Sequence, residues 1–196
     1  LWSAVIAIVV AQAAVVGFSG YRTSQAQAQA DATSREMSTR VESALRWAGL
    51  TETNAARTQA LVVSSDPAVE AEFKAIIPAT SAQISEVQKK LEALATGEAD
   101  KAQMAKIAAA RKAMIDLRGQ ALKLKAEGQN DTAVALVKQS YNPAVAAYLK
   151  TLHDFVELQR QQAQASQADI ASNRLLTVKI AAVVVGLLIL FIVVGA

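Results

Sequence analysis

The feature that most constrains this chain is the position of its two most apolar stretches, one at each end. Residues 1–19 carry no charged side chain, and neither do residues 180–196. A helix of about 20 apolar residues spans the roughly 30 Å hydrocarbon core of a bilayer. We therefore predict transmembrane helices over residues 1–19 and 178–196, with one extramembrane domain between them.

The first apolar stretch also permits a second interpretation, a cleaved signal peptide. The sequence AQA at residues 11–13 offers a small-residue cleavage site. Against this, no charged segment precedes the apolar run, and Trp2 and Lys179 suit the interfaces of a membrane. Because the chain starts inside one apolar run and stops inside the other, we expect a fragment of a longer protein whose cytoplasmic part is absent.

The region between the apolar stretches argues against several classes of function. It holds all 17 acidic residues and every basic residue except Lys179, so it is close to neutral and predicts no nucleic-acid partner. The chain has no cysteine and a single histidine, His153, which argues against a metal site or a hydrolytic triad. Paired carboxylates on an apolar stripe and a glycine-rich phosphate loop are also missing. We predict no metal, no cofactor, no catalytic residue and no enzymatic activity.

Helical periodicity runs through almost the whole central region, while strand signals are nearly absent. We predict an all-α fold: an up-down four-helix bundle on a two-helix stalk, continuous with the two membrane helices. The domain covers residues 20–177. Its helices are expected at 20–63, 67–95, 98–127 and 131–177.

Local signals set these boundaries. Asp66 followed by Pro67 is a strong helix start, and Pro78 should kink the second helix. The segment Thr96–Asp100 turns the chain, and Gly128–Asp131 ends the third helix and caps the fourth. We expect a short first segment of the fourth helix, broken near Pro143.

The third helix places two arginines beside its apolar core stripe. Ile107, Met114 and Ala121 belong to the core stripe, whereas Arg111 and Arg118 lie seven residues apart on the neighbouring stripe. Their long side chains could simply reach solvent over apolar neighbours. The alternative is that both face a pocket at the edge of the core.

Further polar residues are expected at the height of these arginines. In the first helix, Asn54 and Arg57 interrupt an apolar stripe. The remaining candidates lie just after Pro78 and around Pro143: Thr80, Ser81, Tyr141, Asn142 and Tyr148. A pocket with up to three arginines, hydroxyls and an amide suits a carboxylate, because arginine–carboxylate hydrogen bonds are charge-assisted. We predict a ligand with two or three carboxylates.

Two segments carry a resemblance to a known family. Residues 128–149, GQNDTAVALVKQSYNPAVAAYL, resemble the start of the fourth helix in the four-helix-bundle ligand-binding domain of bacterial methyl-accepting chemotaxis proteins. Residues 56–67, ARTQALVVSSDP, are similar to the end of the first helix in the aspartate-receptor group. The resemblance extends over the whole chain. Within the family the chain looks similar to Comamonas-type chemoreceptors for tricarboxylic-acid-cycle intermediates.

The resemblance implies a periplasmic sensor in the bacterial inner membrane that forms a homodimer or higher homo-oligomer. Its ligand would shift the fourth helix against the first, and a cytoplasmic kinase and coupling protein would receive the signal. The three arginine positions of the aspartate receptors fall on Glu52, Arg57 and Leu61, so only Arg57 matches. We therefore expect the arginines of the third helix to supply the missing charge inside one bundle. Malate, succinate and citrate are the expected ligands.

Two other readings of the architecture stay open at this point. The same sensor type occurs in histidine kinases and cyclases. A structural or adaptor membrane protein without a ligand is the third interpretation.

Overall fold

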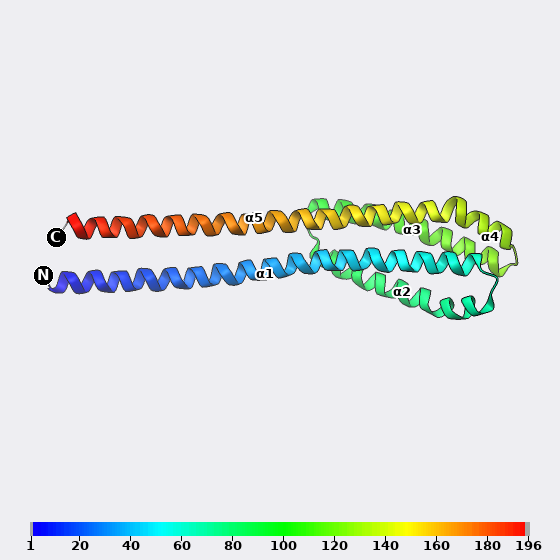
Figure 1. The fold of residues 1–196 in the computed structure, drawn as a ribbon, viewed down its shortest axis with the longest axis horizontal. Helices are drawn as coiled ribbons and strands as arrows, with labels where there is room; N and C mark the ends of the chain where they lie inside the picture. The colour runs from blue at the N-terminus through cyan, green and yellow to red at the C-terminus, as the bar shows by residue number, and fades with distance from the viewer. Residues whose placement is uncertain (1, 195–196) are drawn as a thin grey trace. The chain divides into compact units, whose positions relative to one another are not determined.

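The computed structural model describes the backbone of residues 2–194, which form helices joined by short turns and contain no strand within that range (Figure 1). Some side chains near both ends, including those of residues 2–16 and 187–194, are outside the described set. The chain divides into two compact units. One comprises residues 38–162, and the other comprises residues 1–37 together with residues 163–196.

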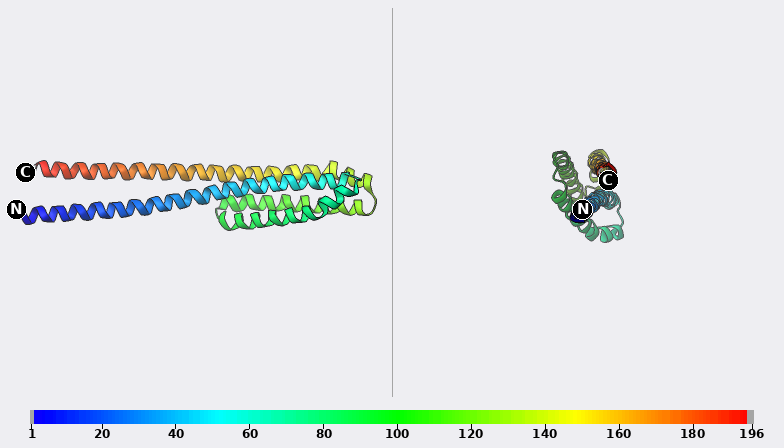
Figure 2. Two further views of the ribbon diagram at one scale, coloured as in Figure 1. Left: turned by 60° about the horizontal axis from the view of Figure 1, so that its bottom comes forward. Right: turned by 90° about the vertical axis from the view of Figure 1, so that its left-hand side faces the viewer.

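The unit of residues 38–162 is a four-helix bundle, which agrees with the predicted fold class. The helical elements of the whole chain are α1 (Trp2–Val63), α2 (Pro67–Leu94), α3 (Glu98–Ala126), α4 (Asn130–Leu136), the π-helical η1 (Val137–Tyr141) and α5 (Asn142–Val194). In the bundle, the last part of α1 packs with α2 and α3, and the fourth position is taken by α4, η1 and the first part of α5 (Figures 1 and 2).

Helices α2 and α3 start at residues 67 and 98 and end at residues 94 and 126, and local signals mark the start of α2 and the end of α3. The carboxylate of Asp66 accepts a hydrogen bond of 2.8 Å from the backbone N–H of Ala68, and Pro67 occupies the first helical position. Gly128 ends α3 with a positive φ of 77°. The N–H groups of Gly128 and Gln129 return to the carbonyls of Lys125 and Leu124, a Schellman ending that needs glycine at this position.

Two local predictions about the fourth helix are wrong. The start of α4 carries no side-chain cap, and the chain does not break near Pro143. Instead, α4 widens into η1, and the N–H of Asn142 bonds to the carbonyl of Val137, five residues back. Proline lacks an N–H and clashes with the carbonyl four residues earlier. A π-helical turn just before Pro143 accommodates this defect without interrupting the helix.

The core is built from the predicted inward faces. Ile107, Met114 and Ala121 of α3 are buried, as expected from their stripe. A cluster of three large buried side chains joins α1 to α5. The indole of Trp47 donates to the Tyr148 hydroxyl over 2.9 Å and meets the Phe155 ring edge-on at 6.5 Å between centroids. Trp47, Tyr148 and Phe155 are fully buried.

The second unit contains the first part of α1 and the last part of α5. Within the described residues, no helix contains a stretch both long and apolar enough to cross a membrane. Many side chains of the two predicted transmembrane helices, residues 1–19 and 178–196, lie outside the described residues. Those helices stay a prediction.

Candidate functional site

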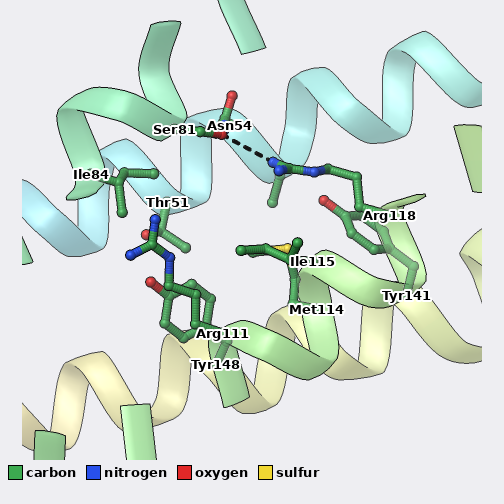
Figure 3. A pocket seen from close by; sticks show the side chains of 11 residues that line it. Thr51, Asn54, Ser81, Ile84, Arg111, Met114, Ile115, Arg118, Tyr141 and Tyr148 are labelled. Atoms are coloured by element: carbon green, nitrogen blue, oxygen red, sulfur yellow. Dashed lines mark hydrogen bonds between the residues drawn. The ribbon is translucent and has the colours of Figure 1, made fainter. Parts of the chain in front are cut away.

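A small, partly open site lies within the bundle, where α1, α2, α3, η1 and α5 come together (Figure 3). Its cavity measures about 10 Å³, which is about the space of one water molecule. The wall is formed by Thr51, Asn54, Ala55, Ser81, Ile84, Arg111, Met114, Ile115, Arg118, Tyr141 and Tyr148.

The two arginines of α3 both lie on this wall, half-buried, and each is held by α2. Arg118 donates from Nη1 to the hydroxyl of Ser81 over 3.2 Å. Arg111 donates from Nη2 to the hydroxyl of Ser85 over 2.8 Å and from Nη1 to the side-chain carbonyl of Gln88. Burial lowers the pKa of the Arg118 guanidinium; the Tyr141 hydroxyl opposes this effect, and the charge of Arg111 adds to it. The Arg118 guanidinium nevertheless stays protonated near neutral pH.

Two tyrosines accompany the arginines, one at each end of the cavity. Figure 3 shows Tyr148 beside Arg111 and Tyr141 beside Arg118. Burial raises the pKa of both hydroxyls, and the neighbouring arginine lowers it in part. Both phenols are therefore neutral hydrogen-bond donors at physiological pH.

Asn54 fixes the α1 side of the site. Its side-chain amide nitrogen donates to the Ser81 hydroxyl over 3.0 Å and to the backbone carbonyl of Ile77 over 3.3 Å. The Ile77 carbonyl can only accept, so this contact determines which end of the amide is nitrogen. Ser81 thus receives hydrogen bonds from both Asn54 and Arg118, which links α1, α2 and α3 at one hydroxyl.

Three buried polar atoms on the wall have no hydrogen-bond partner among the described residues: Thr51 Oγ1, Asn54 Oδ1 and Tyr141 Oη. The side chains of Thr58 and Thr51 approach the hydroxyls of Tyr141 and Tyr148, respectively, and lower their pKa. Neither Tyr141 nor Thr51 makes a bond of standard geometry, however. An unpaired buried polar group costs about 1–3 kcal/mol, so several in one place indicate a site that a bound molecule completes.

The charge of the site is one-sided. Two guanidinium groups stand on the described wall, and none of the wall residues is acidic. Gln88, a hydrogen-bond partner of Arg111, donates in turn to the carboxylate of Glu92. Glu92 is exposed and contacts Gln88 rather than the arginine. An anion with more than one oxygen acceptor would balance this charge.

The structure brings together six of the nine predicted site residues on this wall: Asn54, Ser81, Arg111, Arg118, Tyr141 and Tyr148. Arg57, Thr80 and Asn142 lie outside it. Arg57 donates from Nη1 to the Thr80 hydroxyl over 3.0 Å, on the flank of α1 that faces α2. Asn142 follows Tyr141 by one residue, a rotation of about 100° that turns it away from the cavity.

Two groups of residues at the site were not predicted from the sequence. The first group lines the wall beside the predicted polar residues: Thr51, Ala55, Ile84, Met114 and Ile115. Because polar and apolar wall residues share helical faces, the residue pattern alone did not mark these five as site residues. The partners of Arg111 were also missed, although α2 carries a signal for them. Ser81, Ser85, Gln88 and Glu92 recur at helical spacing and form one polar stripe that faces α3.

Metal chemistry finds little support in the described residues. No group of three or more histidine, cysteine, aspartate or glutamate side chains is arranged there to hold a metal ion. His153 is exposed on α5 and lies apart from the cavity wall.

Comparison with known families agrees with this architecture. Residues 1–173 match the model of the four helix bundle sensory module for signal transduction, the sensor of methyl-accepting chemotaxis proteins. The chain belongs to this family. No curated protein matches the chain at a significant level. The family is a sensory one rather than a catalytic one, and the cavity of this sensory module lies between its helices.

Proposed function

We propose that this sensory module recognises small organic acids with two or three carboxylates, such as malate, succinate and citrate. The observation that carries the proposal is the pairing of Arg111 and Arg118 on one cavity wall that has no acidic residue. Each arginine–carboxylate hydrogen bond contributes about 1.5–3 kcal/mol net. A neutral ligand would leave the excess positive charge of the wall unbalanced.

The arrangement of hydroxyl groups supports a ligand with acidic groups at both ends. One end of the cavity offers Arg111 with Thr51 and Tyr148, and the other offers Arg118 with Tyr141 and Ser81 (Figure 3). A carboxylate at each end would accept from one guanidinium and from neutral hydroxyl donors. It would also give partners to the unpaired hydroxyls of Thr51 and Tyr141.

Binding at this place would signal by displacing helices. A ligand that contacts Arg118 on α3, Thr51 on α1 and Tyr148 on α5 touches elements that can shift relative to one another. Such a ligand changes the equilibrium between two helix arrangements only by the difference in its affinity for them. Two or three charge-assisted bonds are of the size needed for a shift of a few kcal/mol.

We further propose that the bundle lies in the periplasm, anchored in the inner membrane by the apolar runs over residues 1–19 and 178–196. The displacement would pass through the second of these runs to a cytoplasmic signalling part that controls a kinase through a coupling protein in chemotaxis. Homodimers or higher homo-oligomers are expected, as implied by the family resemblance. Residues 1–19 carry no charged side chain and residues 178–196 carry only Lys179, at the edge of the run, which supports the membrane assignment.

A thermal-shift screen of the purified full chain tests the ligand class. Malate, succinate and citrate should raise the melting temperature, and neutral amino acids should not. A ligand present at 100 times its dissociation constant stabilises the folded state by about 2.7 kcal/mol. If no acid stabilises the protein, the proposed function is wrong.

A further inference from the structure

The two arginines of the site are not equally available to a ligand. Arg118 makes a single hydrogen bond to protein among the described residues, the 3.2 Å contact with Ser81. Arg111 uses both terminal nitrogens, one on the Ser85 hydroxyl and one on the side-chain carbonyl of Gln88. A carboxylate that binds a guanidinium through two parallel hydrogen bonds needs donors of this kind. At Arg111, neutral oxygens of α2 already take one N–H of each terminal nitrogen, so a carboxylate has to compete with them.

A second hydrogen bond of the Gln88 side chain strengthens its contact with Arg111. The amide nitrogen of Gln88 donates to the carboxylate of Glu92 over 2.8 Å. Gln88 therefore stands between an anion and a cation, with its N–H toward Glu92 and its carbonyl toward Arg111. Hydrogen bonds in such a chain polarise one another, so this carbonyl is a better acceptor than that of an isolated amide.

The size of the cavity shows that something must move before an organic acid can bind. About 10 Å³ is room for about one water molecule, not for a four-carbon acid. Met114, Tyr141 and Tyr148 are buried and packed among other core residues. Gln88 and Arg111 are half-buried and Ser85 is exposed, so these side chains can reorient with the least loss of packing.

From these observations we infer that Gln88 acts as an internal competitor of the ligand: its side-chain carbonyl occupies Arg111 until an acid displaces it. The inference rests on the proposed function, because it concerns the same site. It assigns Arg118 as the anchor, which binds the first carboxylate. Arg111 binds the second carboxylate after Gln88 has been displaced. The observed dissociation constant is then the intrinsic constant divided by the fraction of molecules in which Arg111 is released.

Three variants of Gln88 and its surroundings distinguish this role from a structural one. Gln88→Ala removes the competing carbonyl and should tighten binding by about three- to tenfold, since Ser85 and water still compete. Gln88→Glu replaces the carbonyl with a carboxylate, which pairs with Arg111 more strongly and should weaken binding by about tenfold. Structural damage at this position would weaken binding in both variants, so opposite signs identify competition.

The matched control is Gln83→Ala, because Gln83 is an exposed glutamine of the same helix. Its affinity should equal that of the wild type. Glu92→Gln keeps the Gln88 contact but removes the anion behind it, and should tighten binding by about twofold or less.

The experiment is isothermal titration of the purified full chain with L-malate and with citrate, for the wild type, these variants and Arg118→Ala. Tighter binding by Gln88→Ala with weaker binding by Gln88→Glu supports the inference. If the wild type binds and Arg118→Ala does not, but Gln88→Ala binds equally or more weakly, the competitor role is wrong and the proposed function stands. If neither the wild type nor Gln88→Ala binds any acid, both proposals are wrong.

Discussion

The bundle holds buried or half-buried charges in two regions, which differ in how the charge is compensated. Near the turn between α2 and α3, Asp100 is 2% exposed, and its carboxylate accepts from the amides of Gln159 and Gln162 over 2.7 and 2.9 Å. Arg40 lies 3.9 Å away and supplies an opposite charge. In the cavity, Arg111 and Arg118 share a wall without a carboxylate, and three buried polar atoms lack partners among the described residues.

The difference separates a structural charge from a binding charge. A buried charge is tolerable when hydrogen bonds and a counter-charge surround it, and it then ties helices together at a fixed register. Asp100 joins α3 to α1 and α5 in this way, although Gln159 Oε1 has no hydrogen-bond partner among the described residues. The cavity wall lacks such a counter-charge, which the proposed organic acid would supply.

The largest expected effect comes from breaking the Asp100 cluster. Asp100→Ala leaves the buried amide of Gln159 and the half-buried amide of Gln162 without their acceptor and should lower the free energy of unfolding by about 2–4 kcal/mol. Chemical denaturation followed by circular dichroism measures this. The control is Asp116→Ala, whose exposed pair with Lys112 should contribute less than about 1 kcal/mol. Equal losses in the two variants would mean that Asp100 is not a structural charge.

The second prediction applies the same change to the cavity. Arg118→Ala should weaken acid binding by about 1.5–3 kcal/mol, or roughly 10- to 100-fold, because it removes the anchor guanidinium. The free energy of unfolding should stay the same or rise, since the variant removes a partly desolvated charge. Titration calorimetry and denaturation measure the two quantities. Arg46→Ala, an exposed arginine of α1, is the control and should change neither. A variant that unfolds easily but binds normally would reverse the assignment.

The third prediction uses the two buried tyrosines, which differ in their partners. Tyr148→Phe removes the acceptor of the Trp47 indole and should cost about 1–3 kcal/mol of unfolding free energy. Tyr141→Phe removes a hydroxyl with no partner among the described residues and should be neutral or stabilising in the absence of ligand. Thermal unfolding of both variants without ligand measures the contrast. Equal destabilisation would show that the Tyr141 hydroxyl is satisfied in the folded protein.

The smallest expected effect is a loss of stability at alkaline pH. Burial raises the pKa of Tyr141 and Tyr148 in the folded state, whereas the unfolded chain ionises near pH 10. Below pH 10 both states hold the proton and the contribution is constant. Above it the unfolded state loses protons first, so stability falls with rising pH. Unfolding free energies between pH 8 and 11 should decline less steeply for Tyr141→Phe than for the wild type. An unchanged slope would show that burial of the Tyr141 hydroxyl does not cause the loss.

The sequence predicted most of the fold because the relevant signals are local. Apolar periodicity, the Asp66–Pro67 start and the Gly128 ending each act within a few residues of the boundary that they set. The continuation of the helix through Pro143 by way of η1 was not predictable from such local signals. It depends on the choice between breaking the helix and widening it to a π-turn, and tertiary packing decides that choice.

The candidate site was predictable in part for a related reason. A stripe of residues predicts which face of a helix is buried, so Arg111, Arg118 and Asn54 could be placed near the core. It does not predict which neighbouring helix each flank meets. For this reason the contact of Arg57 with Thr80 on α2 was not predicted, and neither were the contacts of Arg111 with Ser85 and Gln88.

The most direct test of the central claim compares an acid with its neutral counterpart. Titration calorimetry of the full chain with succinate and with succinamide holds the carbon skeleton constant and replaces each carboxylate with a neutral amide. Because the cavity wall carries two guanidinium groups and no carboxylate, the diacid should bind and the diamide should not. Equal binding of both compounds, or binding of neither this diacid nor malate or citrate, would contradict a role for the two arginines in recognising organic acids.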